Sequence, residues 1–172
     1  MKTLGIAAIV LAMTAGVNAD PIIGQPINVT QNNTEASLVF IGSDAAWTGE
    51  LFWIDGDGAL VGPIFNNHTS LPGDTYTIPN LFNTGDDILF AYKVVTGETN
   101  IFRMDGADLN QFASEAVSSG YYHMFIEDIK LPNGDMDYND NIFDVYTRVV
   151  PTPGSLALLG LAGLAAAPRR RK

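Results

Sequence analysis

The part of this 172-residue chain best suited to chemistry is the acidic segment GDMDYNDNIFDV, residues 134–145. It holds four aspartates and two asparagines beside apolar residues. Carboxylates this close together repel one another, and without a cation some of them would take up a proton. Oxygen donors that lack histidine or cysteine neighbours suit hard divalent ions. The segment therefore indicates a calcium-binding loop.

The spacing of the donors agrees with such a loop. Asp135, Asp137 and Asn139 occupy alternate positions, as oxygen ligands do in an EF-hand. The match to an EF-hand is otherwise poor, because Asp140 stands where that loop has glycine and Tyr146 where it has a bidentate glutamate. Two further acids, Glu127 and Asp128, end the apolar run before the loop and are placed to complete the coordination shell of the ion. The predicted ligands are Asp135, Asp137, Asn139, Asp140, Glu127 and Asp128.

A simpler interpretation stays open, because aspartate and asparagine are also turn residues whose side chains bond to the nearby backbone. A second acidic segment, WIDGDGAL, contains Asp55 and Asp57. Asp-Gly-Asp-Gly is typical of a tight hairpin, so we expect a turn there, with a second metal site as the alternative. Asp144 is expected to pair with Arg148 along a strand or to face solvent, and it is not assigned to the site.

The elements that must position these residues are short apolar or alternating runs separated by turn residues. The runs are rich in β-branched and aromatic residues, as strands are. They span 36–42, 48–54, 76–78, 87–95, 100–104, 120–127 and 142–150. This pattern predicts an all-β fold, an antiparallel β-sandwich of jelly-roll-like topology. Residues 106–120 have weak helical character, and residues 20–35 resemble an irregular or edge segment.

Both ends of the chain are typical of targeting segments. Residues 1–19 combine Lys2 with an apolar helical stretch and small residues, which indicates a secretory signal peptide read by signal peptidase. Residues 150–172 contain a proline hinge, an apolar run at 156–167 and four basic residues at the end. A helix over that run would reach about 18 Å, against a bilayer core of about 30 Å. We therefore expect a temporary stop in the inner membrane, with the basic end cytoplasmic.

The tail resembles the PEP-CTERM sorting signal of Gram-negative bacteria. Val150, Pro151 and Pro153 match the Val-Pro-Glu-Pro hinge of that signal, whereas Thr152 replaces its glutamate. An apolar stretch and terminal arginines complete the resemblance. It implies processing by an exosortase-type membrane enzyme and delivery to the cell surface or the exterior.

Residues 36–149 resemble the DUF4114 family. The resemblance rests on Glu127 and Asp128, on the loop at 134–140, and on the Ile-Phe strand that follows. Ile126 departs from the phenylalanine usual in that family. The resemblance implies an extracellular domain without an assigned activity. The predicted organisation is a signal peptide at 1–19, a DUF4114-like β-sandwich at 20–149 and a sorting tail at 150–172.

The charge of the central region limits its partners. All 19 acidic residues lie within residues 20–150, where four basic residues leave a net charge of −15. Such a body repels nucleic acid and anionic membrane surfaces and attracts divalent cations. The chain has no cysteine, which excludes disulfides, thiol catalysis and thiolate metal sites.

The motifs do not indicate an enzyme. The sequence contains no nucleophile elbow, no His-Glu-x-x-His and no phosphate-binding loop. Its two histidines, His68 and His123, are expected to be a surface residue and a packed residue. The first hypothesis is therefore a non-enzymatic, calcium-stabilised protein of the cell surface or extracellular matrix.

Two other functions are weighed against this one. The alternative is a carbohydrate-binding module that recognises exopolysaccharide or another surface glycan through an aromatic platform, with the same ion taking part. The aromatic candidates are Trp47, Trp53, Tyr121 and Tyr122. We expect these residues to pack in the core instead. A glycosidase with paired carboxylates is the third hypothesis.

Overall fold

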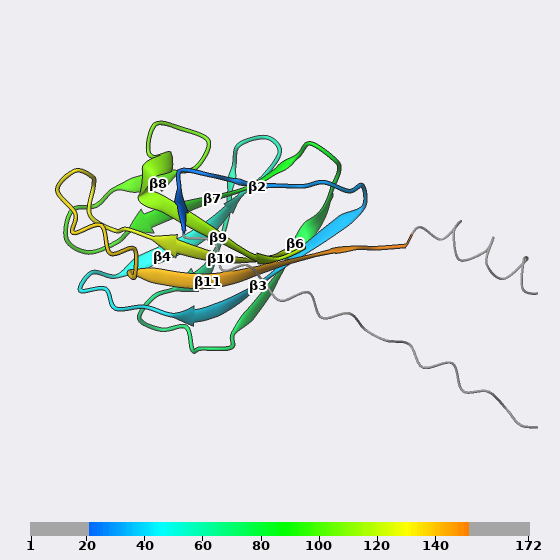
Figure 1. Ribbon diagram of the computed structural model, residues 1–172. Helices are drawn as coiled ribbons and strands as arrows, with labels where there is room; N and C mark the ends of the chain where they lie inside the picture. Colours follow the sequence, from blue (N-terminus) through cyan, green and yellow to red (C-terminus); the bar gives the residue numbers. More distant parts are fainter. Residues whose placement is uncertain (1–20, 152–172) are drawn as a thin grey trace, which may run out of the picture.

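The structure of the protein, a computed structural model, is described for residues 21–151 (Figure 1). Its strands are β1 (Ile22–Ile23), β2 (Ile27–Asn28), β3 (Thr34–Gly42), β4 (Gly49–Ile54), β5 (Leu60–Asn66), β6 (Thr75–Phe82), β7 (Asp87–Val94), β8 (Ile101–Arg103), β9 (Phe112–Ser118), β10 (Tyr121–Ile126) and β11 (Asn141–Val149). A short 3-10 helix, η1 (Leu109–Gln111), precedes β9. The terminal helices predicted at 1–19 and 156–167 lie outside the described residues.

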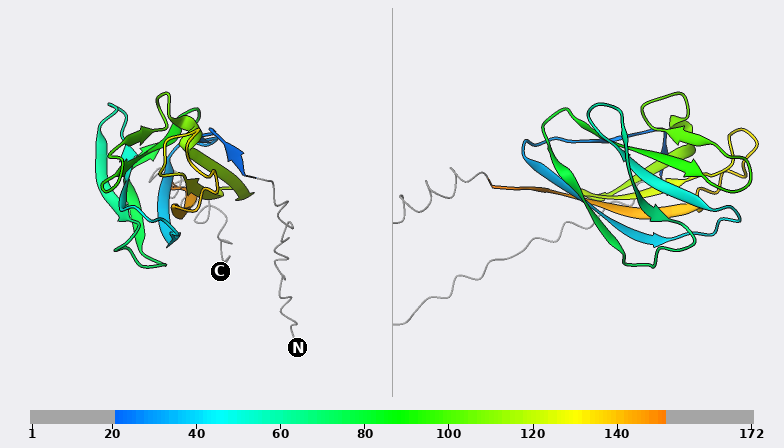
Figure 2. Two further views of the ribbon diagram at one scale, coloured as in Figure 1. Left: turned by 90° about the vertical axis from the view of Figure 1, so that its left-hand side faces the viewer. Right: turned by 180° about the vertical axis from the view of Figure 1, so that it is seen from behind.

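The strands form two antiparallel sheets that pack face to face (Figure 2). One sheet has the order β1-β9-β10-β11-β3-β6, and the other has the order β2-β7-β4-β5, with β8 paired to β7. Neither sheet closes into a barrel within residues 21–151. The all-β prediction is confirmed, and the arrangement fits a β-sandwich. The finer jelly-roll-like topology stays a prediction.

The core lies between the inner faces of the two sheets. In β3, alternate residues Ala36, Leu38 and Phe40 are buried, as the period of two along a strand requires. Aromatic pairs join the layers, and the rings of Phe40 and Phe65 have centroids 5.6 Å apart. Because a shift of one residue would expose these side chains, core packing fixes the register and therefore the place of each loop.

The seven predicted strand runs correspond to β3, β4, β6, β7, β8, β10 and β11. Four strands lie outside these runs. The two-residue strands β1 and β2 fall within residues 20–35, which were expected to be irregular or an edge, and β5 and β9 were missed. The helical character expected for residues 106–120 is wrong beyond η1, because β9 is paired between β1 and β10 and buries Phe112. Such pairing overrides a weak intrinsic helix preference. In β5, Gly62 and Pro63 interrupt the apolar pattern by which a strand is predicted. The strand lies at the edge of its sheet, where proline is tolerated.

The acidic loop lies at one end of the sandwich. It connects β10 to β11, and the pairing of Ile126 with Asn141 brings its two ends together. In Figure 1 the loop, in yellow, is at the end opposite to the C-terminal end of β11, in orange. No helix within residues 21–151 has the length and apolar character to cross a membrane.

Candidate metal centre

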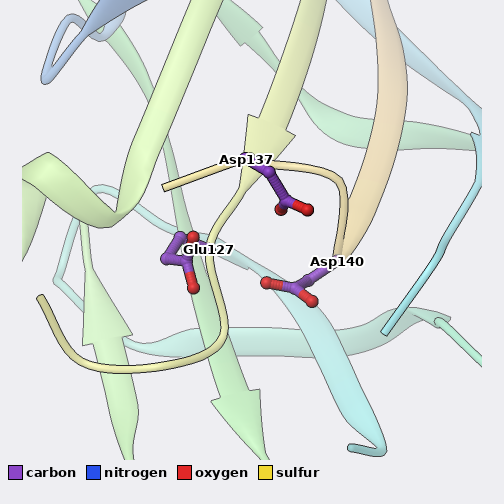
Figure 3. Close-up of side chains that lie close together, drawn as sticks. All are labelled: Glu127, Asp137 and Asp140. Carbon is purple, nitrogen blue, oxygen red and sulfur yellow. The ribbon is translucent and has the colours of Figure 1, made fainter. Parts of the chain in front are cut away.

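Three carboxylates of the β10–β11 connection converge on a common space (Figure 3). Glu127 follows β10 directly, Asp140 directly precedes β11, and Asp137 lies on the loop between them. One oxygen of each carboxylate lies within 4.8 Å of the others. The antiparallel pairing of β10 with β11 explains why residues 10 to 13 positions apart in the chain meet here.

These carboxylates surround a cavity of about 230 Å³. All six predicted ligands line it, together with Asp44, Ala46, Trp47 and Ile129. Its inner part is formed by the buried acids Glu127, Asp128 and Asp140, whereas Asp135 and Asp137 are exposed at its rim. The cavity therefore has a buried acidic floor and a solvent-exposed acidic rim.

Two of the buried carboxylates are incompletely bonded. Glu127 is 0% exposed and Asp128 is 3% exposed. The Oε2 atom of Glu127 and the Oδ2 atom of Asp128 are buried without a hydrogen-bond partner among residues 21–151. A buried charged oxygen without a donor is destabilising by several kcal/mol unless it is neutralised or paired. A cation in the cavity would supply that missing partner.

The electrostatics of the floor follow from this burial. Burial raises the pKa of Asp128 to about 7, and the nearby charge of Asp140 adds to the rise. Burial also raises the pKa of Asp140 to about 6, although the hydrogen bond from the Asp128 backbone opposes it. The pKa of Glu127 is raised by burial and by Asp140. A bound divalent ion would favour the charged forms and reverse these shifts.

The loop backbone holds the donors in an unusual conformation. Met136 and Tyr138 have φ angles of 58° and 54°, in the left-handed region that residues other than glycine seldom adopt. The buried Tyr138 hydroxyl donates to the backbone oxygen of Asn110 at 2.8 Å, which fixes the loop against η1. The amide of Asn139 donates to Asp137 at 2.7 Å and orients that carboxylate.

A buried glutamine that the sequence did not suggest supports the floor. Gln111 is 1% exposed, and its Nε2 donates to the backbone oxygens of Glu127 and Ile129, each at 2.9 Å. Its Oε1 accepts from the N–H of Leu131 at 2.8 Å. The side chain therefore holds the backbone just after β10. No motif marks it, because its role depends on contacts between residues 16 to 20 positions apart.

Gly134 permits the loop to lie against the floor. A Cβ atom at this position would be 2.5 Å from Oε1 of Glu127 and 3.0 Å from the backbone oxygen of Ile129. Such contacts are far shorter than van der Waals separation, so a side chain here would push the loop off Glu127. The glycine in the motif is thus explained by close approach.

The other acidic residues considered from sequence lie elsewhere. The segment with Asp55 is a hairpin turn between β4 and β5, in which Oδ1 of Asp55 accepts from the N–H groups of Asp57 and Ala59. Its carboxylate is therefore used by the turn, as the sequence suggested.

The expectation for Asp144 was wrong. Asp144 is only 4% exposed, and it accepts hydrogen bonds from the hydroxyls of Tyr121 and Tyr146, each at 3.1 Å. His123 contacts its other oxygen. Arg148 pairs with Glu35 instead. Three polar aromatic side chains cover this carboxylate. They explain why Asp144 is buried at a position of β11 that strict alternation of buried and exposed residues would leave exposed.

The donor set of the cavity suits an oxygen-binding ion, because it consists of carboxylates and one amide with no histidine. Comparison with models of known protein families gives no match for this chain, and comparison with curated proteins gives no similar sequence.

Proposed function

We propose that this chain is a non-enzymatic, exported surface or extracellular-matrix protein whose β-sandwich is stabilised by calcium. The ion would lie between Glu127, Asp137 and Asp140, whose oxygens converge, while Asp128, Asp135 and Asn139 line the same cavity. The observation that carries the proposal is the pair of unpartnered buried oxygens on Glu127 and Asp128, two residues that line the acidic cavity. An acidic cluster alone is common on protein surfaces, but buried oxygens without donors require a partner.

Calcium fits the cavity better than smaller or softer ions. Calcium binds oxygens at about 2.3–2.6 Å, so oxygens on opposite sides of it lie up to about 5 Å apart. The carboxylate oxygens of the cluster lie within 4.8 Å of one another, which agrees with that span. Magnesium binds at about 2.0–2.1 Å in a rigid octahedron and usually keeps several waters, so a cavity lined by many protein oxygens suits it less well. The oxygen-only donors disfavour zinc and copper.

The mechanism is coupling of ion binding to folding. The cluster exists only when β10 and β11 are paired, so calcium binds the native chain and not the unfolded one. Binding then stabilises by mass action, about 1.4 kcal/mol at a calcium concentration ten times the dissociation constant. Millimolar calcium outside a cell suits extracellular modules, whose dissociation constants are about 0.1–1 mM.

Export to the surface is supported by the two ends of the sequence. The signal-peptide pattern at 1–19 and the PEP-CTERM-like tail at 150–172 imply signal peptidase and an exosortase-type enzyme as processing partners, with transient anchoring through 156–167. The candidate site lies at the end of the sandwich opposite to Val149, where β11 ends (Figure 1). If the tail holds the protein at a membrane, the site faces away from it.

The proposal is tested by calorimetric titration of the purified protein with calcium chloride. We expect one saturable calcium site and much weaker magnesium binding. The substitution Asp137→Ala removes a ligand and should abolish the binding heat. Asp57→Ala is the matched control, because Asp57 is an exposed aspartate in the distant β4–β5 turn. Calcium binding that is equally strong in both variants, or absent from the unmodified protein by titration and by equilibrium dialysis, would refute the site.

A further inference from the structure

We infer that the calcium cavity is a recognition site for a neutral glycan. Vicinal hydroxyls of a sugar would coordinate the bound ion while the sugar ring packs on the indole of Trp47. This inference rests on the calcium site proposed above and adds a ligand to it. Its evidence is the open rim of the cavity, the placement of Trp47, and the charge around them.

The proposed ion position has a buried side and a side that is exposed to solvent. Glu127 and Asp140 are buried beneath it, whereas Asp137 stands at the exposed rim. Calcium takes about six to eight oxygens, more than three carboxylates supply when each binds through one atom. Coordination positions toward the rim are therefore left for water or for hydroxyl groups. Two adjacent sugar hydroxyls have the geometry to replace two neighbouring waters.

Trp47 provides an aromatic surface beside those positions. It is half-buried and lines the same cavity as the carboxylates. The indole lies directly on Gly97, where a Cβ atom would be 2.3 Å from two of its ring carbons. The main chain at Gly97 thus supports the ring by direct contact. A supported aromatic ring beside polar groups is suited to contact with the apolar C–H face of a sugar.

A single buried amide connects the backbone of Trp47 to the backbone of the ion site. Asn67 donates from Nδ2 to the backbone oxygen of Trp47 at 2.8 Å and to that of Asp140 at 3.4 Å. Its Oδ1 accepts from the N–H of Gly49 at 2.8 Å. The neighbouring His68 also contacts the backbone oxygen of Ala45 in the same loop. The Trp47 loop and the carboxylate are therefore held in fixed relation, which lowers the entropic cost of binding.

The charge of the cavity selects the class of glycan. Besides the three clustered carboxylates, Asp44, Asp128 and Asp135 line the cavity, so one divalent ion leaves it negative. Sulfated and uronic-acid polymers would be repelled by this excess charge. A neutral polysaccharide with vicinal diols, such as a mannan, fits both the open coordination positions and the indole.

The first test is affinity electrophoresis of the full-length protein in gels that contain yeast mannan or alginate. We expect retardation by mannan in millimolar calcium, none with a chelator, and none by alginate. Trp47→Ala should weaken mannan binding about tenfold or more while the calcium-dependent rise in melting temperature persists. Trp47→Phe should keep most of the binding, and Tyr146→Ala, which removes an exposed aromatic ring elsewhere, should keep all of it.

The outcomes separate the two proposals. A calcium-dependent rise in melting temperature without mannan retardation would overturn the glycan site and leave the calcium site standing. No calcium response at all would overturn both. Retardation that persists in chelator, or that survives Trp47→Ala unchanged, would also contradict the inference.

A second measurement examines coordination directly, with terbium as a luminescent substitute for calcium. Energy transfer from Trp47 should sensitise bound terbium, and Trp47→Phe should reduce that emission. Lifetimes in water and heavy water should report about two or more coordinated waters, and added methyl mannoside should displace them. An ion with no coordinated water would show that protein oxygens fill its shell and would overturn the inference.

Discussion

The backbone N–H of Asp128 donates a 2.7 Å hydrogen bond to a carboxylate oxygen of Asp140. The bond orients Asp140 toward the cavity, but it leaves the Asp128 side chain with its own Oδ2 buried and unpartnered. Two buried acids in this relation cannot neutralise one another. Either a proton or a cation must neutralise the negative charge of these carboxylates. The stability of the fold therefore depends on both pH and calcium.

The pH dependence in the absence of calcium follows from the raised pKa values. Asp128 and Asp140 have pKa values of about 7 and about 6 in the folded protein, above the ordinary aspartate value. A carboxyl with a raised folded pKa binds its proton more tightly when folded. Its protonation therefore contributes stability that is fully present below about pH 4 and is lost as pH rises through the folded pKa. We expect chelator-treated protein to lose about 2–4 kcal/mol between pH 4 and pH 7.5 from this source.

Denaturant unfolding at several pH values, with and without calcium, measures this effect. Calcium binds the ionised acids, so it should remove most of the loss near neutral pH. Asp128→Asn should flatten the profile in chelator, because the amide does not titrate. A profile in chelator that is unchanged by this substitution, or that rises from pH 4 to pH 7.5, would contradict the account.

Gly134→Ala should destabilise the loop. The added Cβ would meet Oε1 of Glu127 at 2.5 Å, so either the carboxylate or the loop must move. We expect a loss of about 1–3 kcal/mol, the usual cost of overpacking, together with weaker calcium binding. Gly42→Ala is the control, since a Cβ at Gly42 would meet nothing within 4 Å. Equal effects of the two substitutions in chemical unfolding would show that close packing at Gly134 is not required.

Gln111→Ala should lower the free energy of unfolding more than the loss of an ordinary polar side chain would. The substitution removes the partner of three backbone groups, the oxygens of Glu127 and Ile129 and the N–H of Leu131. Each unsatisfied buried group costs about 1–3 kcal/mol, so we expect a total loss of about 2–5 kcal/mol. Asn110→Ala is the control, because the bond from Tyr138 uses the backbone oxygen of Asn110, which the substitution keeps. Unfolding curves that are the same for both variants would contradict this role.

Substitution of Asp144 should change the stability of the fold without changing calcium binding. Asp144→Ala leaves the hydroxyls of Tyr121 and Tyr146 and the ring of His123 without their shared acceptor. We expect a loss of about 1–3 kcal/mol with an unchanged calcium-induced rise in melting temperature. If thermal melts show that Asp144→Ala abolishes the calcium response, calcium is acting at a place other than the loop cavity.

The sequence was most informative where the signal was local. Alternation and β-branched residues located the main strands, and the dense aspartates of 134–140 located the loop. It could not show that Glu127 lies opposite Asp140, because that relation depends on the pairing of β10 with β11. The burial of Asp144 was likewise hidden, since the rings that cover it include Tyr121 from the neighbouring strand.

Supporting residues were the hardest to foresee. Gln111 and Asn67 are single amides in segments without a motif, and they act through bonds to distant backbone groups. Trp47 was expected in the core with Trp53. Trp53 is buried there, whereas Trp47 is only half-buried and packs against the edge of the core. Trp47 lines the cavity because its loop is tied beside Asp140 through Asn67. Such relations become visible only once the sheets are assembled.

The most direct measurement of the central claim is a pair of thermal melts of the purified protein, one in millimolar calcium and one in excess chelator. Calcium should raise the melting temperature by several degrees, since about 1 kcal/mol shifts it by about 2–8 °C in domains of this size range. Asp137→Ala should abolish the rise, and Asp57→Ala should preserve it. Melting curves that coincide with and without chelator would contradict the claim that a divalent ion holds this cluster together.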